Sequence, residues 1–249
     1  MGKHLRQQKA GKGSPAYRRP SHRFKSEATF RTYDDIEKQG RLNGEIAGFV
    51  DDPSRAPLLM DVVFDNKERR MLIAPEGAEK GGRIAVGAKA ELQFGNALPL
   101  SEIPDGTPIY NIEVTPGDGG RLVRSAGGNA TIVSRDGIWV TVLFPSKKSM
   151  AIDSRCRAQI GVVCGGGRLE APLMTAGNAF YKFHALNRRW PGNRGVKMSA
   201  YNHPFGGKQH HKGKSSCVSH GTPPGRKVGH IGARQTGRRK AKTQVQSSK

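Results

Sequence analysis

The chain has 249 residues, of which 42 are lysine or arginine and 20 are aspartate or glutamate, so its formal net charge is +22. That length allows one large domain or two small ones. No apolar run approaches the ~18–20 residues that a membrane span needs, and the basic N-terminus lacks the apolar segment of a secretory signal. The three widely spaced cysteines argue against a disulfide framework and fit a reducing compartment.

The positive charge is concentrated at the two ends of the chain. Residues 1–26 contain eight lysines and arginines and no acid, and residues 171–249 contain 16 and no acid. The intervening residues 27–170 carry all 20 acids against 18 basic residues, and the eight histidines all lie outside this stretch. An acid-free segment has no internal counter-ions and binds best to a dense polyanion, so we expect nucleic acid as the partner. A membrane surface is disfavoured because neither end shows the period of an amphipathic helix.

In chain order, residues 1–26 are polar and aperiodic, which predicts an irregular extension. From Gly44 onward, short runs rich in β-branched and long apolar residues alternate with turn residues, and each run is predicted to be a strand. The runs before a glycine-rich break at 116–120 are 45–50, 57–64, 69–74, 83–87, 90–95 and 108–114. Those after the break are 130–134, 138–144, 149–153 and 158–163. No long amphipathic helix is predicted between residues 27 and 170.

Strands at this spacing, separated by turn signals, indicate small β-barrels or sandwiches. The break at 116–120 divides the region into two pieces, each long enough to close a compact barrel. In the run 108–114, apolar residues alternate with Asn111 and Glu113, which is typical of a strand buried on one face.

Four side chains in or beside the second series of strands are predicted to lie in the core: Trp139, Phe144, Cys156 and Cys164.

The region from Pro191 onward differs from the strand-rich part of the chain, because its 59 residues contain ten glycines and four prolines. It cannot bury enough apolar surface to offset its backbone entropy. We therefore expect this arm to become ordered only on a partner.

Long motifs in both arms resemble one family. RGVKM…NHPFGG at 194–207 and PPGRKVGHIGARQTGRRK at 223–240 are similar to the C-terminal arm of the universal large-subunit ribosomal protein L-two family. GKGSPAYRRPSHR at 11–23 resembles the N-terminal arm of that family. Phe205 and the APEG at 74–77 favour its archaeal branch.

The resemblance implies a mainly β fold, in which an OB-like barrel is followed by an SH3-like barrel and both ends form long, irregular, basic extensions. On this basis the predicted domains are a basic N-terminal extension at 1–30, the OB-like barrel at 31–115, the SH3-like barrel at 116–185 and a glycine-rich basic extension at 186–249.

The resemblance also implies a function. Proteins of this family are structural constituents of the large ribosomal subunit, with arms threaded into its rRNA. They support subunit assembly and association, tRNA binding and the RNA-made peptidyl transferase centre. The expected partners are large-subunit rRNA and neighbouring large-subunit proteins, with a possible bridge to the small subunit and proximity to tRNA. We expect a cytoplasmic location in the ribosome, no enzymatic activity, no cofactor or metal, no membrane and no homo-oligomer.

Arginine and lysine neutralise phosphates, glycine lets backbone amides approach them, and histidine and asparagine bond to sugars and bases. The residues expected to contact rRNA are Arg18, Arg19, His22, Arg23, Arg121, Arg168, Arg188, Arg189, Arg194, Lys197, Asn202, His203, Gly206, Gly207, Lys208, His210, His211, Lys212, Arg226, Lys227, Arg234, Arg238, Arg239 and Lys240.

Five positions depart from the family pattern, namely Lys197, Ser199, Ala200, Tyr201 and Lys208. The two lysines add charge that suits the same partner. The usual asparagine is missing at Ser199, whereas the tyrosine offers a ring that can stack on a base or sugar.

The glycine clusters at 117–120 and 165–167 lack the lysine and the strand-to-helix transition of a nucleotide-binding loop. With Arg121, Arg124 and Arg168 close by in the sequence, they are expected to lie against an RNA backbone instead.

Other readings of the histidine-rich arm remain open. An RNA-processing enzyme would use His203 with His210 or His211 as acid and base, although no carboxylate in this arm can orient the imidazole. A zinc site built from His210, His211, Cys217 and His220 would include two adjacent ligands, which chelate poorly, among lysines that oppose a cation. A soluble nucleic-acid-binding factor with barrel domains is the third possibility.

Overall fold

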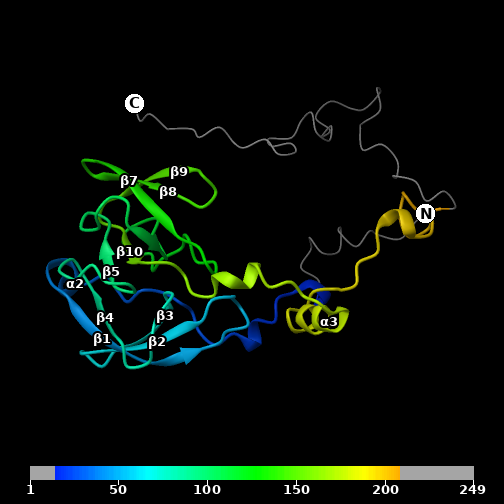
Figure 1. Cartoon of the computed structure of the whole chain (residues 1–249), viewed down its shortest axis with the longest axis horizontal. Coiled ribbons are helices and arrows are strands. Elements are labelled where there is room, and N and C mark those ends of the chain that lie inside the picture. Colours follow the sequence, from blue (N-terminus) through cyan, green and yellow to red (C-terminus); the bar gives the residue numbers. More distant parts are fainter. Residues whose placement is uncertain (1–14, 208–249) are drawn as a thin grey trace. The chain divides into compact units, whose positions relative to one another are not determined.

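The computed structural model of the chain describes residues 15–207 (Figure 1). These residues belong to two compact units, one made of residues 20–172 and the other of residues 15–19 together with 173–207. The predicted rRNA contacts from Lys208 to Lys240 lie outside the described range, as do His210, His211, Cys217 and His220. Within the described range, no helix is both long and apolar enough to cross a membrane.

The unit at residues 20–172 is built on ten strands in one continuous sheet (Figure 1). The strands are β1 (Leu42–Val50), β2 (Leu59–Phe64), β3 (Arg69–Ile73), β4 (Arg83–Val86), β5 (Ala97–Pro99), β6 (Pro108–Tyr110), β7 (Ala130–Asp136), β8 (Trp139–Leu143), β9 (Ser149–Asp153) and β10 (Arg157–Ile160). Their order is β3-β2-β1-β4-β5-β10-β6-β7-β8-β9. The helices of the described chain are α2 (Asp35–Gln39), α3 (Ala176–Ala185) and the short 3-10 helices η1 (Pro15–Tyr17), η2 (Ser21–Arg23), η3 (Gly166–Leu169) and η4 (Gly195–Lys197).

The first half of the sheet centres on β1, which pairs with β2 along one edge and with β4 along the other, both antiparallel. The register of β1 against β2 shifts between Ile46 and Gly48, and such a bulge bends a strand so that the sheet can curve around a core. That core consists of apolar side chains of β1 to β4, chiefly Leu42, Ile46, Met60, Val62, Phe64, Leu72, Ile84 and Val86.

The second half is an antiparallel arrangement in which β6 pairs with both β10 and β7, and β7, β8 and β9 follow as a meander. Its core contains Ile132, Val140, Val142, Ile152 and Ile160, together with Leu98, Leu100, Ile103, Ile109 and Ile112 from before the break at 116–120. The predicted mainly β fold, an OB-like barrel followed by an SH3-like barrel, is confirmed. The exact domain boundaries remain predictions.

The predicted strand at 90–95 is wrong. Leu92 and Phe94 are exposed, Phe94 by 71% of its surface, and Gly95 has a φ of +93° that turns the chain. The strand in this region is β5, whose three residues are all buried. Leu98 of β5 lies in the core of the second half of the sheet.

The expected half-buried strand at 108–114 is also shorter than predicted. Strand β6 ends at Tyr110, because Asn111 adopts a φ of +49°. Asn111 and Glu113, expected on a solvent face, are fully buried. The two carboxylate oxygens of Glu113 accept hydrogen bonds from the backbone N–H groups of Gly117 and Gly119, at 3.2 and 3.0 Å. The glycine-rich break is therefore an ordered loop folded onto a buried acid.

Of the side chains expected in the second core, Cys156 is buried, Cys164 is half-buried, and Phe144 packs against the core. Trp139 is 54% exposed, which contradicts the prediction. Strand β8 turns Val140 and Val142 inward. Trp139 lies on the opposite, outward face of β8. A continuous run of apolar residues does not reveal which of its side chains face outward.

A buried arginine fixes the segment that precedes β1. Nη1 of Arg31 lies 2.7 Å from Glu37, and its Nε lies 2.9 Å from Glu68 in the turn between β2 and β3. Arg31 also pairs with Asp34, which caps helix α2 by accepting from the N–H of Glu37. The hydrogen bond from Arg31 lowers the pKa of Asp34 to about 2. This ion-pair cluster connects the N-terminal segment to the OB-like barrel.

Candidate nucleic-acid interface

Helix α3 opens the basic segment of the second compact unit. The hydroxyl of Thr175 accepts a hydrogen bond from the backbone N–H of Asn178 and so caps the helix. The helix ends where Asn187 takes a φ of +51°, and the N–H of Arg188 donates to the carbonyl of Phe183 at 2.7 Å. The reversal leaves the side chains of the next residues on the surface, where Arg188 and Arg189 are both exposed.

Asn187 also connects the two arms of the chain. Its side-chain amide donates to the backbone carbonyls of Pro15 and Arg18, at 2.9 and 2.7 Å. These contacts span 172 and 169 residues of sequence. They bring the predicted residues Arg18 and Arg19 into the same compact unit as Arg188 and Arg189.

The loop at 194–207 gathers six of the predicted contact residues: Arg194, Lys197, Asn202, His203, Gly206 and Gly207. The backbone N–H of Gly207 donates to the carbonyl of Met198 at 3.2 Å, which closes the loop. A Cβ atom on Gly206 would lie 2.2 Å from the carbonyl oxygen of Ser199. Glycine is therefore required at position 206 for close backbone packing.

His203 is held firmly inside this loop. Its Nδ1 accepts a hydrogen bond from the backbone N–H of Phe205 at 3.1 Å, and the two rings meet edge to face with centroids 5.1 Å apart. A Cβ atom on Gly195 would lie 2.2 Å from the His203 ring, so only glycine leaves room for the imidazole. An accepting Nδ1 places the proton of the neutral ring on Nε2, which makes Nε2 the donor that can face a ligand.

The geometry around His203 does not resemble that of a general base. Among residues 15–207, no carboxylate makes a hydrogen bond or ion pair with this imidazole; the group that orients it is the backbone N–H of Phe205. A histidine that transfers protons is normally oriented by an acceptor on its second nitrogen. The arrangement suits a hydrogen-bond donor to a phosphate or a ribose.

The remaining predicted residues lie on the unit at 20–172. His22 and Arg23 are exposed in η2, and Arg168 is exposed in η3. Arg121 is exposed too, with its Nε 3.6 Å from Asp118. All four residues are on the surface of the unit, which a phosphate contact requires.

Arg124 is different, because its guanidinium is directed into the protein. It donates to the backbone carbonyls of Gly120 and Ala28, and burial lowers its pKa. Arg124 therefore has a role inside the fold, where it joins the N-terminal segment to the loop at 116–120.

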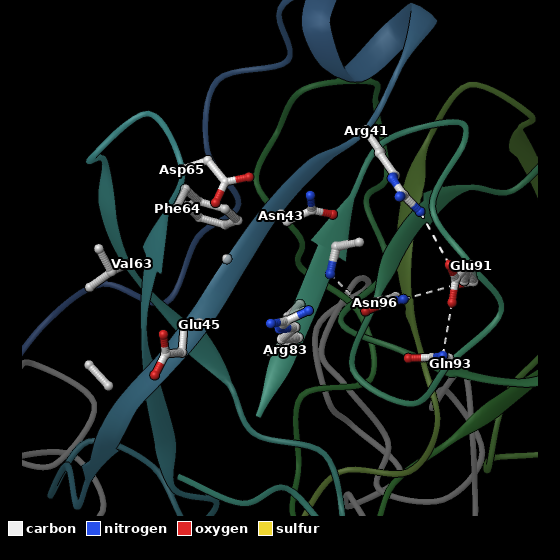
Figure 2. Close-up of a pocket in the computed structure, with 14 residues that line it drawn as sticks. Arg41, Asn43, Glu45, Val63, Phe64, Asp65, Arg83, Glu91, Gln93 and Asn96 are labelled. Carbon is white, nitrogen blue, oxygen red and sulfur yellow. Dashed lines mark hydrogen bonds and ion pairs between the residues drawn. The ribbon is translucent and has the colours of Figure 1, made fainter. Parts of the chain in front are cut away.

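A groove of about 850 Å³ crosses the outer face of β1 and β4 (Figure 2). Arg41 pairs with Glu91 across it at 3.2 Å. The buried Asn96 forms part of its wall, accepting from the N–H of Ala85 and donating to the carbonyl of Glu91. The groove is lined by two arginines, Arg41 and Arg83, and three acids, Glu45, Asp65 and Glu91. This balance does not favour a phosphate backbone, so we do not expect the groove to bind RNA.

Within the described part of the chain, no three histidine, cysteine or acidic side chains are placed to hold a metal ion.

The sequence analysis did not predict Phe180, Tyr181 and Lys182 as surface residues of a helix, and they are exposed on α3. Thr175 three residues before Asn178, followed by apolar residues at helical spacing, was the signal that a helix starts here.

Comparison with known proteins agrees with the arm motifs. The family model for the C-terminal domain of ribosomal proteins L2 matches residues 93–225. The large ribosomal subunit protein uL2 of Methanopyrus kandleri is 46% identical over 239 residues, which is 96% of this chain and 98% of that protein. Proteins of the same name from Methanococcus maripaludis (strain C6) and Methanococcus vannielii are each 48% identical over 240 residues, covering 96% of this chain and all of theirs. The chain therefore belongs to the L2 family of ribosomal proteins.

Proposed function

We propose that this chain is a structural protein of the large ribosomal subunit, and that it binds large-subunit rRNA through its two basic arms. One observation carries the proposal. Asn187 joins segments from opposite ends of the sequence into one compact unit, and the described residues of that unit, 15–19 and 173–207, contain seven lysines and arginines and no acid. Such a surface has no internal counter-ions, and a polyphosphate supplies them.

The local chemistry supports RNA as that polyphosphate. Exposed arginines neutralise phosphate oxygens, and the glycines of the loop at 194–207 let the backbone approach closely. Nε2 of His203 supplies a donor for a phosphate or a 2′-hydroxyl. Anchored in this way, the protein would support subunit assembly and association, tRNA binding and the RNA-made peptidyl transferase centre, in contact with neighbouring large-subunit proteins in the cytoplasmic ribosome.

Sedimentation tests this role. An epitope-tagged chain expressed in Methanococcus maripaludis should sediment with large subunits and remain there through a moderate salt wash. A soluble nucleic-acid-binding factor would instead be released by the wash. Release of the tagged chain at moderate salt would contradict the proposal.

The proposed role is not enzymatic. An RNA-processing enzyme would need His203 as an acid or base, yet Nδ1 of this histidine is already engaged by the N–H of Phe205. We expect the purified chain to leave RNA intact across a range of pH and divalent ions. Cleavage that disappears in His203→Ala would show that the protein is an enzyme.

A further inference from the structure

Helix α3 exposes more apolar surface than an isolated ten-residue helix should. None of its residues is buried, although it carries Phe180, Tyr181 and Phe183. A helix this short is marginal in water and normally owes its stability to the packing of one face. The apolar side chains of α3 therefore need packing partners, either within the chain or on a ligand.

One side of the helix is partnered within the chain. The ring of Phe183 stacks on that of Trp190, with centroids 6.2 Å apart and planes inclined by 11°. Both rings are half-buried. This contact, with the hydrogen bonds of Asn187, holds the C-terminal end of α3 in place.

The other side is an exposed group of rings, formed by Phe180, Tyr181 and His184. Phe180 stacks on His184 one turn later, with centroids 6.0 Å apart, and meets Tyr181 edge to face at 5.6 Å. The exposed fraction is 47% for Phe180 and 72% for Tyr181. Because the rings hold one another in position, little side-chain entropy remains to be lost when a ligand stacks on them.

We propose that this ring cluster of Phe180, Tyr181 and His184 binds unpaired RNA bases by stacking. The inference rests on the proposed function and adds a site to it, since the arginines contact phosphates whereas these rings contact bases. Every nucleobase has a flat π-face, so aromatic platforms bind single-stranded or bulged nucleotides with little sequence preference. A base within a duplex is already stacked and presents no such face.

The charge around the rings favours RNA over a protein partner. Lys182 lies on the same helix, Arg188 and Arg189 follow its end, and no acid occurs from residue 171 onward. A protein that covered this patch would need acidic groups to balance these cations, and an apolar partner would leave them unpaired. A polynucleotide supplies bases for the rings and phosphates for the cations together.

The test compares two fluorescein-labelled RNA hairpins, one carrying a three-adenine bulge and the other fully paired, against the full-length chain. Tyr181→Leu keeps an apolar side chain of good helix propensity but removes the flat ring. It should weaken binding to the bulged hairpin roughly ten-fold and binding to the paired hairpin by less than about two-fold. Tyr181→Phe should bind both hairpins like the wild type.

Salt dependence separates stacking from charge. Tyr181→Leu should leave the slope of log affinity against log salt unchanged, whereas Arg188→Ala should lower its magnitude by roughly one, because one phosphate contact is lost. Phe94→Ala is the matched control, since this ring is 71% exposed but lies on the barrel unit. It should leave binding to both hairpins unchanged.

Each result bears on one proposal. If the wild type binds the bulged hairpin and Tyr181→Leu binds it equally well, the stacking site is overturned while the rRNA-binding role stands. If Tyr181→Leu weakens binding to both hairpins equally, stacking on unpaired bases is likewise overturned. If the wild type binds neither hairpin and also washes off large subunits, the proposed function itself fails.

Discussion

Arg157 and Glu113 form an ion pair with no solvent exposure, in which Nη2 of the arginine lies 2.7 Å from Oε1 of the acid. A second buried acid, Glu37, lies 2.7 Å from Nη1. The guanidinium carbon sits 5.1 Å from the ring centre of Phe30 and 4.7 Å from that of Tyr33, so the cation lies against two aromatic rings. One side chain on β10 thus connects helix α2, the N-terminal segment and the loop after β6.

Replacing Arg157 by alanine should destabilise the barrel unit strongly. The change leaves Glu37 and Glu113 buried without their common partner, and breaking a buried pair in this way costs on the order of 3–5 kcal/mol. Equilibrium urea unfolding of the full chain measures the effect. Arg155→Ala is the control, because that guanidinium is exposed and pairs with Asp153 at the surface. If the two variants unfolded at the same urea concentration, the buried pair would not stabilise the fold.

Acid should weaken the fold through Asp34. Its pKa is about 2 in the folded protein, compared with an ordinary value of 3.8, because Arg31 donates to it. The folded state therefore resists protonation, so this contribution to the free energy of unfolding is complete above about pH 4 and is lost as the pH falls towards 2. Asp34→Asn, which keeps a residue able to cap α2, should show a shallower loss of stability between pH 4 and 2. An acid profile identical to that of the wild type would contradict this origin.

The strands were largely predictable from sequence, because runs such as 57–64 and 138–144 are rich in β-branched and long apolar residues and are bounded by turn residues. The failures have local causes. Strand β5 has only three residues, too few for a periodic pattern. Arg157 is a fully buried charge, and its acidic partners lie 44 and 120 residues away in sequence, where no local pattern reveals them.

The candidate site was only partly predictable, for a related reason. The absence of acid in the arms and the motif at 194–207 predicted rRNA contacts at His203 and its neighbours, and these contacts remain predictions. The contact of Asn187 with Pro15 joins segments 172 residues apart and leaves no local signature. The role of Arg124 was also hidden, because it lies near the glycines at 117–120 in sequence but bonds to the carbonyl of Ala28, which is 96 residues away.

Cys156 should be an inert thiol. It is fully buried, and burial raises its pKa to about 12, so almost no thiolate is present near neutral pH. In a Cys164→Ser, Cys217→Ser background, a thiol reagent at pH 8 should modify this cysteine only as fast as the protein unfolds. The same reagent should react at once in denaturant. Rapid labelling of the folded protein would show that the segment between β9 and β10, where Cys156 lies, opens locally.

Gly195→Ala should damage RNA binding without affecting the barrels. The added Cβ would lie 2.2 Å from the His203 ring, so the imidazole must leave the position in which Phe205 orients it. Losing one hydrogen bond to a charged phosphate costs roughly 1.5–3 kcal/mol, so affinity for large-subunit rRNA should fall roughly ten-fold or more. Gly192→Ala is the matched control in the same arm, because its Cβ would meet nothing within 4 Å. Filter binding measures the affinity of each variant for large-subunit rRNA, and urea unfolding checks that the barrels remain intact. Equal affinities for the two variants would show that the position of His203 does not matter for binding.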